Sequence, residues 1–316
     1  MDFRFNDEQL ALRDAISAFC TSRDDVNAAD TWSVLTDMGV FSLLIPEERG
    51  GFGGGVVEAA IVFEQLGAHL VAGPLLWSTI TAPLVSDAAR ITGVDVRGDA
   101  RGPVVVEHVT DSDVVVIVRD DRVERCEAST LGDGVAGEPL DPLTPATQFD
   151  VVPSGAVIGG ANDGHRLRLV GTVLAAAMLV GVAQGALDVA RDYALERHQF
   201  GVPIGSFQAV KHLLADCYVR TELARGAAYA AAALSDDATP GEAATAASTA
   251  KLLAGEAGIA NGRTAVQVLG GMGFTWEMRP HYFLKRAWVL EQTFGTGDTH
   301  ALALADALGS DATLWT

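Results

Sequence analysis

The sequence predicts a mainly α-helical protein with a small β-domain in its middle. Three observations lead to this fold class. Long proline-free runs rich in Ala, Leu and Val follow residue 171. β-branched residues cluster between residues 96 and 158, separated by Asp, Gly and Pro. Apolar residues with helical spacing precede that cluster. We therefore expect a helical domain at residues 1–95, a β-domain at 96–165 and a C-terminal helical bundle at 166–316.

The composition indicates an acidic, folded protein of a reducing compartment. Its 316 residues allow one large domain or two to three small ones, and a hydrophobic fraction of 49% suffices for a core. A net charge of −19 argues against nucleic acid and anionic membranes as partners. Cys20, Cys126 and Cys217 lack metal-binding spacing. No signal peptide is visible at the start, so we expect a cytoplasmic protein.

The N-terminal segment has two apolar patterns with helical spacing and then a glycine-rich turn. The first pattern consists of Leu10, Leu12, Ile16 and Phe19, and the second of Trp32, Leu35, Met38 and Gly39. Pro46 and the following glycines predict a turn before a helix at Val56–Leu66. A phosphate-binding loop at Gly50–Gly55 is the alternative, but no strand precedes it and the Lys-Ser/Thr pair is missing.

The middle segment is predicted to form short strands. The β-branched runs are Val104–Val106, Val114–Val118 and Val151–Val152. Asp120 and Asp121 mark a hairpin tip. We interpret the acidic residues of this segment as solvated loop residues rather than metal ligands.

The C-terminal segment opens with a long helix, predicted at Thr172–Glu196. Gly171–Leu187 is nearly free of polar groups, which raises a membrane span as an alternative. We reject the span because Gln184 interrupts it, Ala and Gly dominate, and basic and aromatic flanks are absent. A helix buried in a bundle explains the run better.

Stop and start signals divide the rest of the C-terminal segment into antiparallel helices. Gly201 and Pro203 end the first helix, and Ser206 is an N-cap residue type for the next. Further helices are expected at Gly241–Leu269 and Asp298–Leu308. Short connections between long helices indicate a bundle.

Three islands in this bundle carry chemistry. Arg197 at a helix end can hold a phosphate through two hydrogen bonds, and Gln208 can bond a nearby carbonyl; alternatively, Arg197 caps helix carbonyls and Gln208 lies on a solvated face. The run from Gln267 through Gly270 and Gly271 is either a helix C-cap or a close approach for a flat or anionic ligand. Thr296 is in a glycine turn at the start of the last helix, whose N–H groups can face an anion.

Together these islands resemble the acyl-CoA dehydrogenase family of flavoenzymes, and the resemblance covers the whole length. The N-terminal Pro46-Glu47-Glu48 with its glycines and Glu64–Gly67 also match. The resemblance implies a helical domain, a β-domain and a four-helix C-terminal domain that assemble as a tetramer, with FAD between subunits. It assigns contacts with the pyrophosphate and adenosine end of FAD to Arg197, Phe200, Gln208, Gln267, Gly270 and Gly271, with Thr296 near the nucleotide.

The sequence departs from the family where the reaction takes place. In the family, a glutamate removes the α-proton of an acyl-CoA thioester while a β-hydride goes to the flavin. The usual position of that glutamate, before Gly-Thr, is Phe294 here, and the minority position is Gly171. Neither residue is a base, so no catalytic residue is predicted in this chain.

The acyl-CoA and flavin-ring motifs are missing as well. The family's CoA-contacting Asp-x-x-Arg falls near Leu169 and Thr172, and Arg166 and Arg168 are out of register. The family's Ser-Glu-Pro-like stretch and its aromatic-x-Ile-Ser/Thr segment are absent between residues 82 and 158.

These departures favour one subunit of a heteromeric, α2β2 acyl-CoA dehydrogenase, an oxidoreductase acting on CH–CH bonds. A homologous partner would supply the glutamate, the flavin-ring pocket and most acyl-CoA contacts. By analogy with the family, the substrate is a bulky thioester such as a steroid-derived one, and an electron-transfer flavoprotein accepts the electrons.

Two alternatives stay open. The first is a homotetramer that uses Asp298, about one helical turn past the usual position, as its base; an acidic residue favoured by the helix dipole is the simpler interpretation. The second is a flavin-free structural subunit. The retained Arg197, Gln208 and Gln267 argue against it, because a bare scaffold needs none of them.

Overall fold

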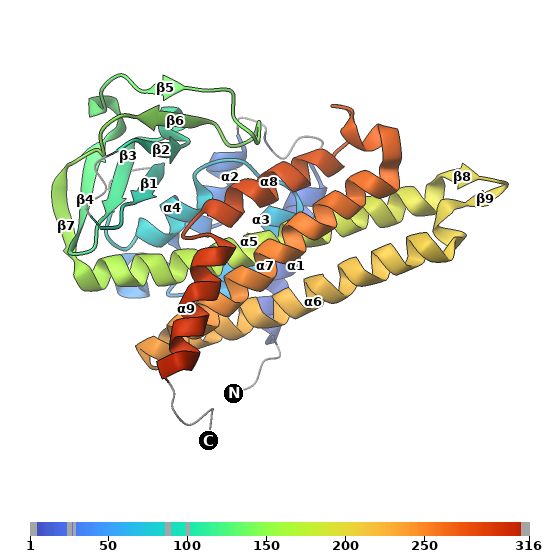
Figure 1. Cartoon of the computed structure of the whole chain (residues 1–316). Coiled ribbons are helices and arrows are strands. Elements are labelled where there is room, and N and C mark those ends of the chain that lie inside the picture. The colour runs from blue at the N-terminus through green and yellow to red at the C-terminus, as the bar shows by residue number, and fades with distance from the viewer. Residues whose placement is uncertain (1–4, 24–26, 28–29, 86–89, 99–101, 311–316) are drawn as a thin grey trace. The chain divides into compact units, whose positions relative to one another are not determined.

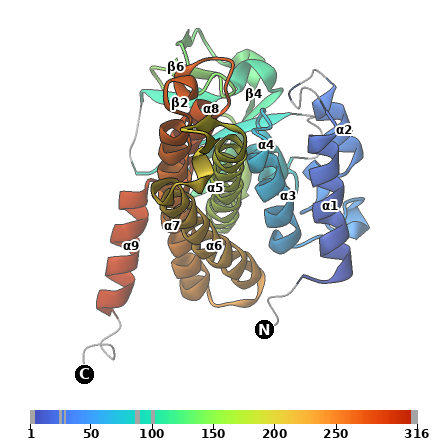
Figure 2. The same cartoon turned by 90° about the vertical axis from the view of Figure 1, so that its right-hand side faces the viewer.

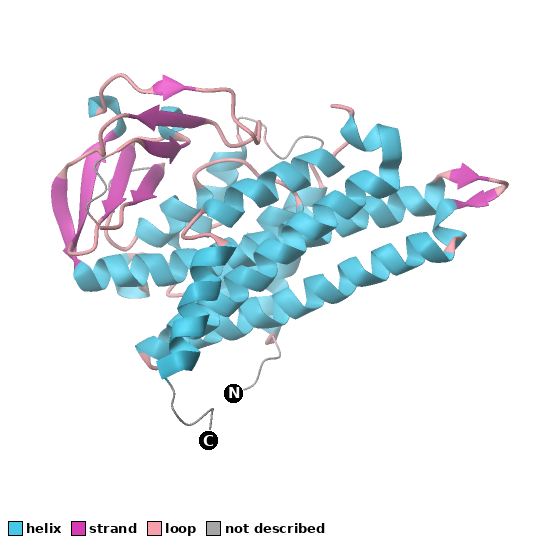
Figure 3. Cartoon of the chain, viewed as in Figure 1, coloured by secondary structure: helices cyan, strands magenta, loops and turns pink. Residues whose placement is uncertain are grey.

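The computed structural model describes residues 5–23, 27, 30–85, 90–98 and 102–310. The chain forms two compact units, each assembled from segments distant in sequence. Unit 1 comprises Met1–Val26, Ala60–Leu70 and Thr172–Thr316, and unit 2 comprises Asn27–Ala59 and Val71–Gly171. Helices dominate and most strands belong to unit 2, which confirms the predicted fold class (Figure 3). The division at residues 95 and 165 stays a prediction, since the units follow contacts rather than chain order.

Unit 1 is a bundle of long helices. Its C-terminal helices are α5 (Ala161–Glu196, which starts in unit 2), α6 (Gln208–Asp237), α7 (Pro240–Leu269), α8 (Pro280–Gln292) and α9 (Gly297–Ser310), joined by α1 (Asp7–Thr21) and most of α3 (Val56–Ala68). Helix α7 packs against α6, α8 and α9 (Figure 1). The predicted C-terminal bundle is confirmed, and Figure 2 shows α5, α6 and α7 close to end-on.

Two predicted helix boundaries in this bundle were wrong. Helix α5 begins at Ala161, eleven residues before the predicted Thr172, because no proline stops it and Asp163 accepts the Gly160 N–H at 2.8 Å. Ser206 is not the N-cap of α6. The short 3₁₀ helix η5 (Ile204–Ser206) intervenes, so Phe207 becomes the N-cap, and the Ser206 hydroxyl donates to the Pro203 carbonyl at 2.7 Å.

Unit 2 combines short helices with two small sheets. The helices are α2 (Thr31–Asp37), α4 (Leu75–Thr81) and the 3₁₀ turns η1 (Val40–Ser42), η2 (Glu47–Arg49), η3 (Val109–Asp111) and η4 (Ala128–Thr130). One sheet has the order β1 (Ile91–Asp95), β3 (Val114–Val118), β4 (Arg122–Glu127), β7 (Ala156–Gly160), and the other has the order β2 (Val104–Glu107), β6 (Ala146–Phe149), β5 (Val135–Ala136). Among the described strands of these sheets, β1 and β3 pair in parallel and the other pairs are antiparallel.

The predicted strands of the middle segment are partly confirmed. The hairpin tip at Asp120 and Asp121 joins the antiparallel strands β3 and β4. The first strand starts at Ile91, within the segment predicted to be helical. Val151 and Val152 form no strand and lie between β6 and β7, because the chain turns there and leaves Val151 72% exposed.

The prediction that the acidic residues of this segment are solvated was wrong for Asp141 and Glu124. Asp141 is fully buried and accepts the Thr144 hydroxyl at 2.8 Å. Glu124 is 3% exposed and pairs with Arg122 at 2.5 Å and Arg119 at 3.2 Å. Burial by itself would raise the pKa of Glu124, but the two guanidinium groups hold that pKa below its usual value. Among the described residues, no group of His, Cys, Asp and Glu side chains could hold a metal ion.

Helix α5 is the central helix of unit 1. It is long and apolar enough to cross a membrane, but 89% of its most apolar window is buried inside the protein, as expected for a core helix. Glycines on both helices let α3 and α5 approach closely. A Cβ on Gly181 of α5 would lie 1.9 Å from the Glu64 carbonyl oxygen, and a Cβ on Gly67 of α3 would lie 2.2 Å from the Met178 carbonyl oxygen. The two backbones therefore touch, which no larger residue would allow.

We expect Gly181→Ala to destabilise the chain by about 3 kcal/mol or more, because the added methyl group meets backbone that cannot yield. The control is Gly226→Ala on the exposed face of α6, where an added Cβ meets nothing within 4 Å. That control should stabilise the chain by about 0.5–1 kcal/mol through helix propensity. Urea unfolding measures both. Equal free energies of unfolding for the two variants would contradict the described packing.

Candidate nucleotide-contact site and base position

A two-stranded hairpin at the end of α5 holds the first island. Strands β8 (His198–Gln199) and β9 (Val202–Pro203) pair through a tip at Phe200 and Gly201, whose φ angles are +53° and +81°. Positive φ at both central residues matches the twist of a two-residue hairpin loop. Phe200 is 93% exposed at this tip. Gly201 and Pro203 predicted the end of the helix here, but they did not predict the hairpin.

Arg197 and Gln208 flank this hairpin on its two sides. The Arg197 main chain is fixed, since its carbonyl accepts the Ile204 N–H at 2.8 Å, while its side chain is exposed. Within the described part of the chain, the Arg197 guanidinium has no hydrogen-bond or ion-pair partner. Gln208 is exposed as the first residue of α6. Both side chains are therefore available to a ligand or to another subunit.

The second island ends α7. The Gly270 N–H bonds the Gln267 and Val266 carbonyls, so the C-cap interpretation is confirmed. Gly270 has a φ of +62°, and a Cβ added to Gly270 or Gly271 would meet nothing within 4 Å. Gln267 is exposed on the last turn. The backbone is open here, which leaves room for a flat or anionic group to approach it.

The first two islands lie at the same end of the bundle, and the third lies elsewhere. Helices α5 and α7 both end at the hairpin end of unit 1, and the antiparallel α6 begins there (Figures 1 and 2). Thr296 is at the far end of α8, where α9 starts. A single chain therefore does not place Thr296 beside Arg197, Gln208 and Gln267.

The turn between α8 and α9 contains the expected base position. Phe294 is only 4% exposed and has a φ of +59°, so its ring packs inside unit 1. Thr296 caps α9, since its hydroxyl accepts the Thr299 N–H at 3.2 Å. Asp298 is exposed in the first turn of α9. Thr296 is thus the N-cap of α9.

Two residues that hold this turn were missed from the sequence. Lys251 of α7 is 1% exposed, and its ammonium group donates to the carbonyls of Glu291 and Gly295, both at 2.8 Å. The Glu291 carboxylate accepts the Gly297 N–H at 2.6 Å and so caps α9. The only sequence signal was a lysine within an alanine-rich stripe of α7. Lys251 and Glu291 are therefore both engaged in holding the turn.

Gly171, the minority position for the base in the family, cannot act as a base either. Gly171 is buried inside α5. Nearby, Arg168 donates to the Asp95 carboxylate at 2.7 Å and lies within 3.4 Å of Asp120. The ion pair with Asp95 explains the presence of Arg168 without a CoA contact.

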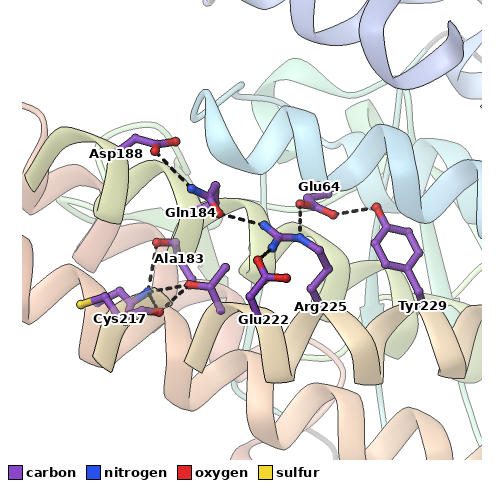
Figure 4. Close-up of polar contacts among 10 residues, drawn as sticks. Glu64, Ala183, Gln184, Asp188, Cys217, Glu222, Arg225 and Tyr229 are labelled. Atoms are coloured by element: carbon purple, nitrogen blue, oxygen red, sulfur yellow. Dashed lines mark hydrogen bonds and ion pairs between the residues drawn. The ribbon is translucent and has the colours of Figure 1, made fainter. Parts of the chain in front are cut away.

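A buried polar network in unit 1 contains the carboxylate of Glu64 (Figure 4). Arg225 donates to Glu64 at 2.9 Å, and the Tyr229 hydroxyl donates to its other oxygen at 2.6 Å. Arg225 also donates to Gln184 at 2.9 Å and pairs with Glu222. Burial and the adjacent carboxylate raise the pKa of Tyr229. This network ties α3, α5 and α6 together, so Glu64 serves packing rather than proton transfer.

Sequence comparison identifies the class of protein. The chain belongs to the acyl-CoA dehydrogenase family: residues 6–88 match the family's N-terminal domain and residues 169–309 its C-terminal domain. The acyl-CoA dehydrogenase IpdE2 of Mycolicibacterium smegmatis is 33% identical over 310 residues, which cover 92% of this chain and 95% of that protein.

Solved structures share the fold. A variant of the steroid acyl-CoA dehydrogenase Tcur3481–Tcur3483 superposes with a TM-score of 0.83 at 22% identity, covering 97% of this chain and 99% of that one. The ChsE4–ChsE5 complex of Mycobacterium tuberculosis gives a TM-score of 0.83 at 23% identity, covering 98% and 99%. The family thus shares N-terminal helices, a pair of sheets in the middle and a C-terminal helical bundle.

The engagement of Lys251 predicts a pH dependence of stability. Burial lowers the pKa of Lys251 from 10.5 to about 8. Between these values the unfolded chain binds more protons, so the free energy of unfolding contributed by this group rises with pH. We expect the unfolding free energy of the wild type minus that of Lys251→Met to increase by about 2 kcal/mol across this window.

The matched control is Lys211→Met, which removes an exposed lysine of α6. Its difference from the wild type should stay flat over the same pH range in the same urea titrations. A Lys251→Met difference that is also flat, or that falls with pH, would contradict the buried position of this lysine.

Proposed function

We propose that this chain is the non-catalytic subunit of a heteromeric FAD-dependent acyl-CoA dehydrogenase, and that a homologous partner supplies the catalytic glutamate. The observation that carries the proposal is Phe294, which takes the place of the base and is 4% exposed. A buried phenyl ring accepts no proton. The neighbouring Lys251 and Glu291 are bonded to the turn and are not available in its place.

The hairpin end of unit 1 supports the FAD part of the proposal. Arg197 is exposed with no partner among the described side chains, and an arginine binds a pyrophosphate through paired hydrogen bonds. The open backbone at Gly270 and Gly271 accepts close approach of the nucleotide. Gln208 and Gln267 supply amide groups for its carbonyl and hydroxyl groups, and Phe200 an apolar contact. When bound, FAD supplies the hydride acceptor.

Exposed apolar side chains support assembly with a partner of the same fold. They gather on the hairpin, on α6 and on the segment after α7: Phe200, Val202, Leu213, Tyr218, Val219, Leu223, Met272, Phe274 and Trp276. Monomeric proteins seldom expose so many large apolar groups. The Tcur3481–Tcur3483 and ChsE4–ChsE5 structures each pair two proteins. We extend such pairing to this chain as an α2β2 complex.

The proposed substrate is supported by the same relatives, and the proposed acceptor by the family resemblance alone. The reaction is α,β-desaturation of an acyl-CoA thioester held at the partner's site, with a steroid-derived acyl group as in the steroid enzyme above. An electron-transfer flavoprotein is the proposed acceptor and the cytoplasm the proposed location. The net charge of −19 sets nucleic acid and anionic membranes aside as partners.

The first test compares Arg197→Ala with Arg191→Ala in the complex co-expressed with a homologous acyl-CoA dehydrogenase chain. Both variants remove one exposed arginine at the C-terminal end of α5, but Arg191 only pairs with Asp188 and Asp192 on its own helix. We expect Arg197→Ala to weaken FAD binding about tenfold or more, since it removes charge-assisted hydrogen bonds to phosphate. Flavin absorbance after dialysis measures the loss, and Arg191→Ala should retain FAD.

The same experiment separates the alternatives. A complex that holds no FAD would favour the flavin-free structural subunit. Full FAD occupancy and dehydrogenase activity in this chain purified alone would contradict the proposal and favour a homotetramer.

Asp298→Asn tests the homotetramer directly. Asp298 is exposed at the start of α9, where a carboxylate interacts favourably with the helix dipole. We therefore expect turnover of the complex to change by less than about threefold, since the dipole contribution is small. Loss of about a thousandfold with FAD retained would instead identify Asp298 as the base.

A further inference from the structure

Unit 2 contains a cavity of about 310 Å³ that none of the family roles above uses. It lies between α2, the loop after α3 and the loops that follow β2 and precede β6. Its lining is Asn27, Thr31, Trp32, Leu35, Ala72, Gly73, Pro74, Arg90, His108, Asp111, Pro142, Leu143 and Pro145. Small-molecule sites in proteins begin at about this volume and combine apolar walls with a few polar groups.

The cation of this cavity is Arg90, which is held in place by aromatic stacking. Its guanidinium carbon lies 4.9 Å from the centre of the Trp32 ring. Trp32 in turn stacks on Phe41, with ring centres 4.1 Å apart and planes 18° from parallel. The main chain of Arg90 is fixed by Asp113, whose carboxylate accepts the Arg90 N–H at 2.9 Å. The guanidinium is therefore positioned before any ligand arrives.

The N–H groups of this guanidinium have no hydrogen-bond or ion-pair partner among the residues that the structure describes. That is unusual in a chain with 41 acidic and 22 basic side chains. Thr31, which borders the same cavity and is 5% exposed, also has a hydroxyl without a partner in the described part of the chain. Buried polar groups normally find partners, so the buried Thr31 hydroxyl points to a ligand. Arg90 is half-buried, and its guanidinium is free to pair with the same ligand.

The remaining walls are apolar and stiff. Leu35 and Leu143 supply aliphatic surface, and Pro74, Pro142 and Pro145 supply ring faces with no N–H to satisfy. Asn27 closes one side by accepting the Ala72 N–H at 2.7 Å. Asp111, the acidic residue of the lining, is exposed in η3, so solvent screens its charge.

We infer that this cavity is a binding site for a small carboxylate with an apolar body. Arg90 pairs with the carboxylate, Thr31 contributes a hydroxyl to the lining, and the leucine and proline walls enclose the apolar part. A planar guanidinium favours a carboxylate because it offers two parallel N–H donors. The site lies wholly within unit 2, so it stands or fails independently of the proposed subunit role.

Benzoate and benzamide are the matched probes, because they share a phenyl ring and differ in charge. Calorimetric titration of the purified chain should show benzoate binding with a Kd on the order of 1 mM, as expected of so small a ligand. Benzamide should bind at least about tenfold more weakly. Arg90→Gln should weaken benzoate binding by about tenfold or more, since it removes a charged hydrogen-bond donor.

Arg97→Gln is the control, because Arg97 is an exposed arginine of unit 2 that pairs with Asp95 and is outside the lining. Its affinity for benzoate should equal that of the wild type. Equal affinities for benzoate and benzamide in the wild type would overturn the inference without any variant. So would no benzoate binding up to about 10 mM, or unchanged binding in a folded Arg90→Gln protein.

Discussion

The close contact between α3 and α5 is the constraint on which unit 1 depends. Gly67 and Gly181 bring the two backbones together, and a Cβ at Gly185 would lie 2.5 Å from the Ala68 carbonyl oxygen. With α5 fixed in this way, Arg225 of α6 reaches Glu64 of α3 and Gln184 of α5. Small residues thus set the helix spacing, and the polar network fixes the rotation of the helices. The fixed spacing and rotation of these helices place the hairpin at the end of the bundle where α7 terminates.

The same bundle divides its charged residues into two groups. Beside the base position, Lys251 binds two carbonyls of the α8–α9 turn and Glu291 caps α9. Phe294 is buried there, and Asp298 is exposed in the first turn of α9. At the hairpin end, Arg197 is exposed with no partner among the described residues. Lys251 and Glu291 already hold these bonds and do not replace the missing base, whereas Arg197 is free to bind an anionic ligand.

The sequence predicted most of the helices and the helix ends at the glycine turns, because helical periodicity and Gly or Pro signals are local. It placed the start of α5 and the end of the helical N-terminal segment incorrectly, since nothing local marks Ala161 or Ile91 as a boundary. Glu124 was predicted to be solvated because its arginine partners were not apparent from spacing. Lys251 and Glu291 escaped notice for the same reason: their bonds join residues 40 positions apart or more, or depend on a turn. The cavity beside Arg90 required tertiary structure.

The measurement that tests the account most directly is the FAD content per chain of the native complex, isolated with its partner and counted by flavin absorbance and quantitative amino-acid analysis. If the neighbouring subunit contributes the flavin-ring pocket and the base, one FAD accompanies every two chains. A ratio of one FAD per chain, with this polypeptide turning over substrate by itself, would contradict the division of labour inferred from Phe294 and Arg197.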